Sequence, residues 1–145
     1  MSPSLTVPGL VVAARAIRDE GTSYHYLPPG HAAESRPDVV DALLREVSTV
    51  GLPASAGLVW TTDAPYRETP EQLERHAQAG ALAVEMQAAS LFAFVAARGV
   101  PLGAVAHVTN AAGHTREQFD EGIATLGTEI LQAIRRAGHR NIAAG

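Results

Sequence analysis

The sequence predicts an α/β fold: a three-layer α/β/α sandwich around a mostly parallel or mixed central sheet. Short apolar segments alternate along the chain with segments of helical period, as in sheets whose parallel strands are connected by helices. The 145 residues suit one compact domain, residues 1–145, without internal repeats. Apolar residues make up 46% of the chain and charged residues 18%, a balance that excludes a disordered or collagen-like protein.

The first half predicts a strand, a long loop, a helix and a second strand. Residues 10–17 are apolar and partly β-branched, as in a strand buried on both faces. Residues 18–36 combine glycines and prolines with two tyrosines, which predicts a loop with aromatic anchors. A helix is expected to begin at Pro37 and to end near Gly51. The segment 54–62 predicts a strand that ends in a site-forming loop.

The next helix has a clear beginning and end. Thr69, Pro70 and Gln72 form a capping-box pattern, and Gly80 is a plausible C-cap. Beyond it, short apolar runs predict strands, and apolar residues at helical spacing predict helices. These elements are a strand at 81–86, a helix at 87–98 stopped by Gly99, a strand at 102–109 and a helix at 115–137. Ligands bind beyond the carboxyl ends of parallel strands, so the loops 62–69, 85–87 and 109–114 are expected to meet there.

Composition excludes several kinds of chemistry. Fifteen acidic and eleven basic residues give a net charge of −4, so the chain offers no basic surface to nucleic acid. All basic residues are arginine and cysteine is absent, which excludes Schiff-base lysines, thiolate nucleophiles and cysteine zinc sites. No two of the six histidines have the i, i+4 spacing of a helical zinc motif, and we expect no metal site. The apolar run 7–14 is too short to span a bilayer, so we expect a cytoplasmic protein without a membrane partner.

The segment 84–89 is the strongest candidate site, because Glu85 and Gln87 flank Met86 where a buried strand meets a helix. A carboxylate at this junction can accept hydrogen bonds from a substrate hydroxyl or from the N–H groups of the helix N-terminus. Spacing alone favours the second, structural role. Asp63 is likewise expected to cap or brace its loop rather than to act as a base.

Three motifs in order carry a resemblance to a known family. They are Thr-Thr-Asp-Ala-Pro-Tyr at 61–66, Ala-Val-Glu-Met-Gln-Ala-Ala at 83–89 and Val-Thr-Asn at 108–110. From about Ala16 onward the chain resembles the C-terminal half of the nucleoside phosphorylase and nucleosidase superfamily, especially its uridine phosphorylase-like branch. The second motif is similar to the family's Val-Glu-Met-Glu-Ala-Ala ribose motif. The resemblance implies a phosphorylase-like fold truncated at the N-terminus.

For the sugar, the resemblance implies that Met86 packs against the ribose and that Glu85 supports the site. Gln87 takes the catalytic position of the family's glutamate that binds the ribose 2′- and 3′-hydroxyls. An amide keeps an acceptor but lacks the charge that stabilises an oxocarbenium-like sugar. We expect this departure to cost about one order of magnitude in rate.

For the base, the resemblance implies contacts from the loop that contains Thr62, Tyr66 and Arg67. Tyr66 matches an aromatic residue that lines the base pocket, whereas the family's preceding phenylalanine is Pro65 here. Arg67 is placed to reach a pyrimidine carbonyl or a partner subunit, or is simply a solvated loop arginine. Asn110 stands where purine-cleaving members have an aspartate, and an amide cannot act as a general acid. A pyrimidine or a 6-oxopurine nucleoside is therefore expected as the ligand.

The family's first half supplies a glycine-rich phosphate loop, and the scattered glycines Gly9, Gly21 and Gly30 do not form one. We expect weak phosphate binding by this chain alone and completion in a homo-oligomer or by a separate N-terminal-half chain. Inorganic phosphate is the expected co-substrate, with no other cofactor. Three hypotheses remain open: a nucleoside phosphorylase that transfers a pentosyl group to phosphate, an inactive nucleoside-binding or assembly module, and a nucleosidase that uses water.

Overall fold

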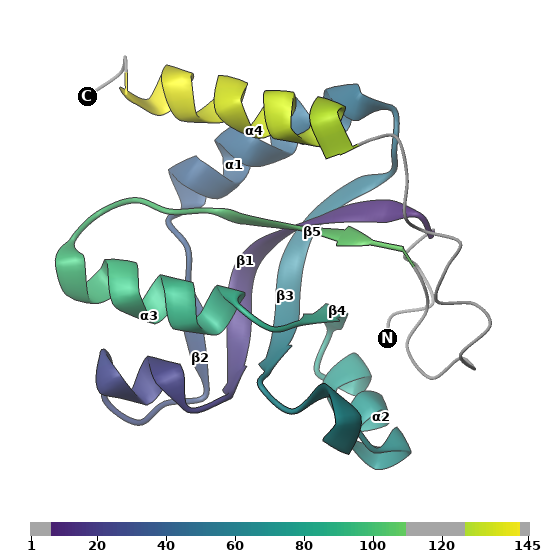
Figure 1. Cartoon of the computed structure of the whole chain (residues 1–145), viewed down its shortest axis with the longest axis vertical. Coiled ribbons are helices and arrows are strands. Elements are labelled where there is room, and N and C mark those ends of the chain that lie inside the picture. Colours follow the sequence, from purple (N-terminus) through teal and green to yellow (C-terminus); the bar gives the residue numbers. More distant parts are fainter. Residues whose placement is uncertain (1–6, 110–126, 143–145) are drawn as a thin grey trace.

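A mixed five-stranded sheet with helices on both faces forms the molecule (Figure 1). The computed structural model describes residues 7–109 and 127–142. The strands are β1 (Gly9–Asp19), β2 (Ala32–Glu34), β3 (Ala54–Thr62), β4 (Ala81–Glu85) and β5 (Ala104–Val108). The helices are α1 (Pro37–Val47), α2 (Pro70–Gln78), α3 (Ala88–Arg98) and α4 (Gly127–Ile142), with short 3-10 turns η1 (Thr22–His25), η2 (Ser48–Val50) and η3 (Pro65–Arg67).

β1 is the central strand of the sheet. One of its edges pairs with β3 in parallel along almost its whole length, and β3 in turn pairs with β4 in parallel. Its other edge is shared by two antiparallel strands, β5 along the first half and β2 along the second. A bulge at Ala14 separates these halves, and the Ser35 N–H donates to the Ala14 carbonyl at 3.0 Å. The carboxyl ends of the three parallel strands β1, β3 and β4 therefore lie at the same end of the sheet.

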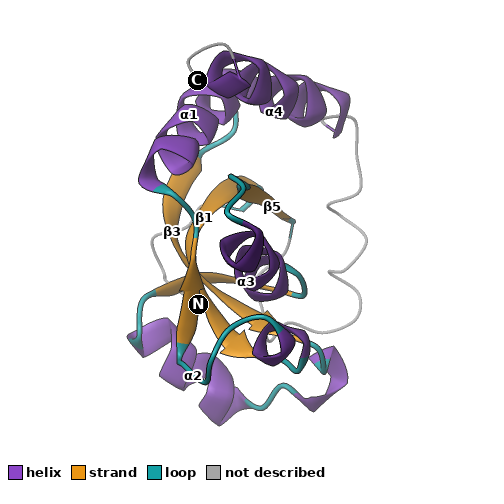
Figure 2. Ribbon diagram, turned by 90° about the vertical axis from the view of Figure 1, so that its left-hand side faces the viewer, coloured by secondary structure: helices purple, strands orange, loops and turns teal. Residues whose placement is uncertain are grey.

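Both faces of the sheet are buried, as the three-layer prediction requires. Along β1, Leu10 and Val12 pack with α1 and α4, while Val11 and Ala13 pack with Phe92 of α3. Figures 1 and 2 show α1 and α4 side by side, with α2 at the far end of the molecule. A third, smaller cluster forms around Trp60 near α2. Within the described ranges, no helix is long and apolar enough to cross a membrane.

Most predicted elements are present at the expected positions. The capping box of α2 is complete, since the Gln72 N–H donates to the Thr69 side chain and the Gln72 side chain accepts from the Thr69 N–H. Gly80 and Gly99 follow helices with φ of +91° and +66°, conformations that favour glycine. The predicted loop 18–36 contains one strand that the prediction missed, β2. Three residues are too few to show a period, and only pairing with β1 defines this strand.

Three predictions concern residues that lie partly or wholly outside the described ranges. The helix expected at 115–137 is seen from Gly127 onward as α4. Its first half, the loop 110–114 and the candidate residue Asn110 fall in the part of the chain that the structure does not describe.

Candidate functional site

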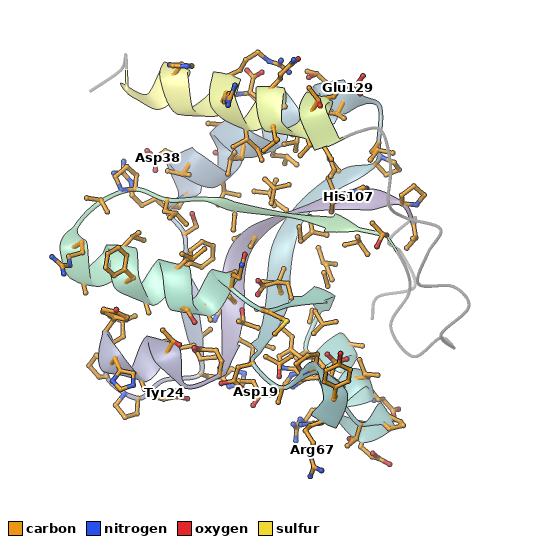
Figure 3. All side chains as sticks on the ribbon, in the orientation of Figure 1. Asp19, Tyr24, Asp38, Arg67, His107 and Glu129 are labelled. Atoms are coloured by element: carbon orange, nitrogen blue, oxygen red, sulfur yellow. The ribbon has the colours of Figure 1, made fainter. Side chains whose placement is uncertain are left out.

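The carboxyl ends of β1, β3 and β4 form the candidate site. Asp19, at the end of β1, and Arg67, after β3, lie toward the same end of the molecule in Figure 3. Two segments of this site carry most of the predicted residues. One is the β4–α3 turn, which comprises residues 85–88, and the other is the loop predicted to contact the base, residues 63–68, here called the base loop.

In the β4–α3 turn, the Glu85 carboxylate lies against the N-terminus of α3. Its Oε2 accepts hydrogen bonds from the backbone N–H of Gln87 at 2.6 Å and of Ala88 at 2.8 Å. The first N–H groups of a helix have no partner within the helix, and the helix dipole favours negative charge there. Glu85 thus plays the structural role that its spacing favours.

Thr61 completes this arrangement from the neighbouring strand. Its side chain is fully buried, and its hydroxyl donates to Glu85 Oε1 while it accepts from the Ala89 N–H at 3.0 Å. The parallel register of β3 and β4 sets Thr61 beside Glu85. Thr61 is not among the residues predicted for the site. The alternation of side chains along a strand would have predicted that Thr61 and Thr62 lie on opposite faces of the sheet. It would not have predicted that Thr61 contacts Glu85.

Met86 and Gln87 project from the turn toward solvent. Met86 is 53% exposed and Gln87 is exposed. The Gln87 side chain makes no capping hydrogen bond to α3, because Glu85 already accepts the helix N–H groups. Within the part of the chain that the structure describes, the Gln87 amide has no hydrogen-bond partner, so both of its polar groups are available to a ligand.

Thr62 lies on the opposite face of the sheet from Glu85. It is buried and its hydroxyl accepts from the Ala64 N–H at 3.2 Å, which stabilises the start of the base loop. The structure therefore separates Thr62 from the β4–α3 turn. On that face, a polar cavity of about 110 Å³ is lined by Asp19, Trp60, Thr62, Asp63, Ala64, Arg67, Glu68 and Gln72.

The base loop is anchored at its first residue, and its middle residues 65–67 are exposed. Asp63 Oδ2 accepts from the Gly21 N–H at 3.0 Å, so Asp63 braces its loop as predicted. Tyr66 is 99% exposed, and Arg67 is exposed at the rim of the cavity. Burial raises the pKa of Glu68 above its ordinary value.

A buried carboxylate links the loop after β1 to α3. Glu20 is 8% exposed, and its Oε2 accepts from the Ser23 N–H at 3.0 Å and from the Ser90 hydroxyl at 2.6 Å. Burial by itself raises the pKa of Glu20, but the hydrogen bonds from Ser23 and Ser90 together lower it below its ordinary value. Glu20 thereby fixes the first turn of α3 relative to β1.

The same loop is held by a buried arginine. Arg18 is 6% exposed and donates to the Ser23 hydroxyl and to the Pro28 carbonyl, both at 2.7 Å. Its guanidinium also lies 4.3 Å from the centre of the Tyr24 ring, and Tyr26 packs edge-on against Phe94 of α3. The two tyrosines therefore anchor this loop, as its composition predicts.

On the α2 side, His76 packs on Trp60. The ring centres are 4.3 Å apart, and the Trp60 indole N–H donates to Asp19 at 2.9 Å. Burial, followed by the charge of Arg75, lowers the pKa of His76 below its ordinary value. The described residues contain no group of three His, Cys, Asp or Glu side chains that could hold a metal ion.

The chain matches the family model of the phosphorylase superfamily over residues 1–141. It belongs to the phosphorylase superfamily. The match begins before Ala16, where the motif resemblance was expected to start, and so includes the first half of β1.

Two comparisons show how far the similarity to known proteins extends. The chain is 30% identical over 108 residues to a guanosine phosphorylase from Halorubrum lacusprofundi, covering 74% of this chain and 45% of that protein. It is similar in fold to the crystal structure of an AMP nucleosidase from Bacteroides thetaiotaomicron, with a TM-score of 0.76 and 24% identity over 97% of this chain and 58% of the other. The chain thus spans about half the length of these relatives.

Proposed function

We propose that this chain provides the nucleoside-binding half of a nucleoside phosphorylase site. The reaction would transfer a pentosyl group from a pyrimidine or 6-oxopurine nucleoside to inorganic phosphate. The observation that carries the proposal is the β4–α3 turn of a phosphorylase-superfamily chain, which presents Met86 and the unused amide of Gln87 at the carboxyl end of a parallel strand. Similarity to a protein named guanosine phosphorylase supports a 6-oxopurine nucleoside as one substrate.

In this proposal, each residue acts on a defined part of the nucleoside. The bond between C1′ and the base nitrogen breaks, a bond from C1′ to a phosphate oxygen forms, and the base leaves with the electron pair. The Gln87 amide oxygen accepts from the ribose hydroxyls and Met86 packs against the sugar. Tyr66 and Arg67 contact the base, and Thr62 supports their loop through Ala64. Asn110 is assigned to the base by motif alone and donates a hydrogen bond to the leaving group.

The phosphate subsite is proposed to come from elsewhere. The chain spans 45% of the guanosine phosphorylase that it matches. Among residues 7–109 and 127–142, β4 pairs with β3 alone, so its outer edge is available to further strands. We propose that a segment equivalent to the rest of the relatives completes the site, either in another chain or through a homo-oligomer.

A specific observation favours a second candidate, an inactive nucleoside-binding or assembly module. The residue at the ribose position is the neutral Gln87, and the one carboxylate of the β4–α3 turn is occupied by backbone N–H groups. A third candidate, a nucleosidase, uses water in place of phosphate and draws on the fold shared with an AMP nucleosidase.

Three measurements on one sample distinguish these candidates. The mass of the purified chain is measured by light scattering, and the same sample is assayed for cleavage of uridine, inosine and guanosine with and without phosphate. Binding of the three nucleosides is measured by titration. Phosphate-dependent cleavage supports the phosphorylase, and cleavage independent of phosphate supports the nucleosidase. Binding of a nucleoside without cleavage supports the module, whereas no binding of any of the three contradicts all the candidates.

Substitution of Gln87 tests the ribose role directly. Gln87→Glu supplies a charged acceptor and is expected to raise the cleavage rate about tenfold where a catalytic site assembles. Gln132→Glu is the matched control, because Gln132 is exposed on α4 at the other end of the molecule (Figure 1). An equal rate in Gln87→Glu and wild type, within an assembled complex that cleaves nucleosides, would count against a ribose contact at Gln87.

A further inference from the structure

We propose that Thr61 and Glu85 form a positioning pair that sets the geometry of the β4–α3 turn, and that the Glu85 carboxylate itself does not bind the sugar. The inference rests on the proposed function for its ribose part. It assigns Thr61 a role that neither the motifs nor the comparisons assign. It also gives different roles to the two positions at which the family's ribose motif has glutamates. Glu85 holds the turn, and Gln87 contacts the ligand.

The pair forms a continuous chain of hydrogen bonds across two strands and a helix. The Ala89 N–H donates to the Thr61 hydroxyl, which donates its own proton to Glu85 Oε1. The other carboxylate oxygen, Oε2, accepts from the N–H groups of Gln87 and Ala88. The backbone N–H groups of the N-cap residue Gln87 and of the first two residues of α3 are thereby satisfied by one carboxylate and one hydroxyl.

This arrangement leaves little of Glu85 for a ligand. Each carboxylate oxygen already has a donor, and Oε2 has two. A ribose hydroxyl that bound Glu85 would displace a charge-assisted hydrogen bond to a helix N-terminus, which is among the stronger kinds of hydrogen bond. Displacement is therefore less favourable than binding at the unoccupied amide of Gln87.

The Thr61 hydroxyl is the group on which the pair depends, and a side chain of the same shape without a hydroxyl cannot make its hydrogen bonds. Thr61 is fully buried, so its hydroxyl has no access to water when its partners are removed. A valine at this position keeps the shape but leaves Glu85 Oε1 and the Ala89 N–H without their partner. Gln87 and Met86 then lose the fixed backbone from which they project.

Amide hydrogen exchange of the full chain, measured by NMR, tests the pair without any ligand. Thr61→Val is expected to speed exchange at Ala89, and at Gln87 and Ala88, by roughly tenfold, because a buried hydrogen-bond network loses its central member. Thr61→Ser retains the hydroxyl and is expected to stay within about twofold of the wild type. Thr62→Val removes the neighbouring buried hydroxyl on the other face and is expected to leave these three amides unchanged. Equal exchange at Ala89 in wild type and Thr61→Val overturns the pair.

Nucleoside titration of the same samples tests the ribose part, with guanosine and uridine as probes. Thr61→Val and Glu85→Gln are each expected to weaken nucleoside binding roughly tenfold. Thr61→Ser, which keeps the hydroxyl, is expected to bind as the wild type does. Tight binding by Thr61→Val, despite faster exchange at Ala89, would show that the pair stabilises α3 without positioning the ligand and would overturn the proposal. A wild-type chain that binds neither nucleoside overturns the ribose part together with the proposed function, while the exchange result still decides whether the pair holds the turn.

Discussion

The β4–α3 turn and the base loop lie at the same end of the sheet but are built in opposite ways. In the turn, Glu85 and Thr61 satisfy the backbone donors of α3, and only Met86 and Gln87 face solvent. In the base loop, the start is braced while Tyr66 is 99% exposed. The proposed sugar site is therefore preorganised within this chain, whereas the proposed base site needs a ligand or a partner to cover it.

The two segments differ because β4 and β3 are followed by different elements. β4 leads directly into α3, whose N-terminal N–H groups require acceptors and so draw in the Glu85 carboxylate. β3 leads into the short turn η3 before α2 begins, and α2 already has its own cap from Thr69. Asp63 and Thr62 hold the start of the loop, whereas the Tyr66 side chain is 99% exposed.

The largest expected effect comes from removing the support beneath α3. Phe92 is fully buried against the sheet, and Phe92→Ala is expected to lower the free energy of unfolding by about 3–5 kcal/mol through lost burial and a cavity. Urea unfolding measures this change. Leu91→Ala, on the exposed side of the same helix turn, is the control and should cost far less. Similar losses for both variants would show that α3 does not depend on this packing.

On the opposite face, a pH-dependent loss of stability is expected from His76. Its pKa lies below the ordinary 6.5 because it is buried, so the unfolded chain takes up a proton at higher pH than the folded chain does. The free energy of unfolding should therefore fall as the pH drops through 6.5. Chemical unfolding followed by fluorescence of Trp60, the sole tryptophan, reports it directly.

His76→Phe keeps an aromatic ring on Trp60 and removes the titration. The variant is expected to lose the part of the change between pH 8 and pH 5 that His76 contributes and to keep the opposite contribution of Glu68, whose pKa is raised. His25→Phe, at an exposed histidine, should retain both contributions. This range lies above the window of Glu20, whose lowered pKa confines its contribution to pH below 4.5. The same slope in His76→Phe and wild type would contradict the assignment.

The smallest expected effect on stability is at Tyr66. Tyr66→Ala should change the free energy of unfolding by less than about 0.5 kcal/mol, since the side chain is almost fully exposed. Nucleoside binding should nevertheless weaken, because base stacking on an aromatic ring contributes roughly 1–3 kcal/mol. Thermal melting and nucleoside titration of the same sample measure the two effects. Unchanged binding would remove Tyr66 from the proposed base site and leave Arg67 as the proposed base contact of this loop.

Local signals in the sequence predicted most of the elements correctly. The capping box at Thr69 and Gln72 lies within four residues, and the glycines after helices act through their own φ angles. The alternation of apolar segments predicted both buried faces of the sheet. These features depend on neighbours in sequence, so they can be recognised without knowing the fold.

Local sequence patterns therefore predicted the α/β layers, the helix caps and the position of the segment 83–89 at a strand–helix junction. Long-range pairing sets β2 and β5 on one edge of β1, joins Thr61 to Glu85, and puts Thr62 on the other face. These features arise from strand register and pairing between residues far apart in the chain. A register is set by the packing of the whole sheet, and a shift of one residue would exchange Thr61 and Thr62 between its faces.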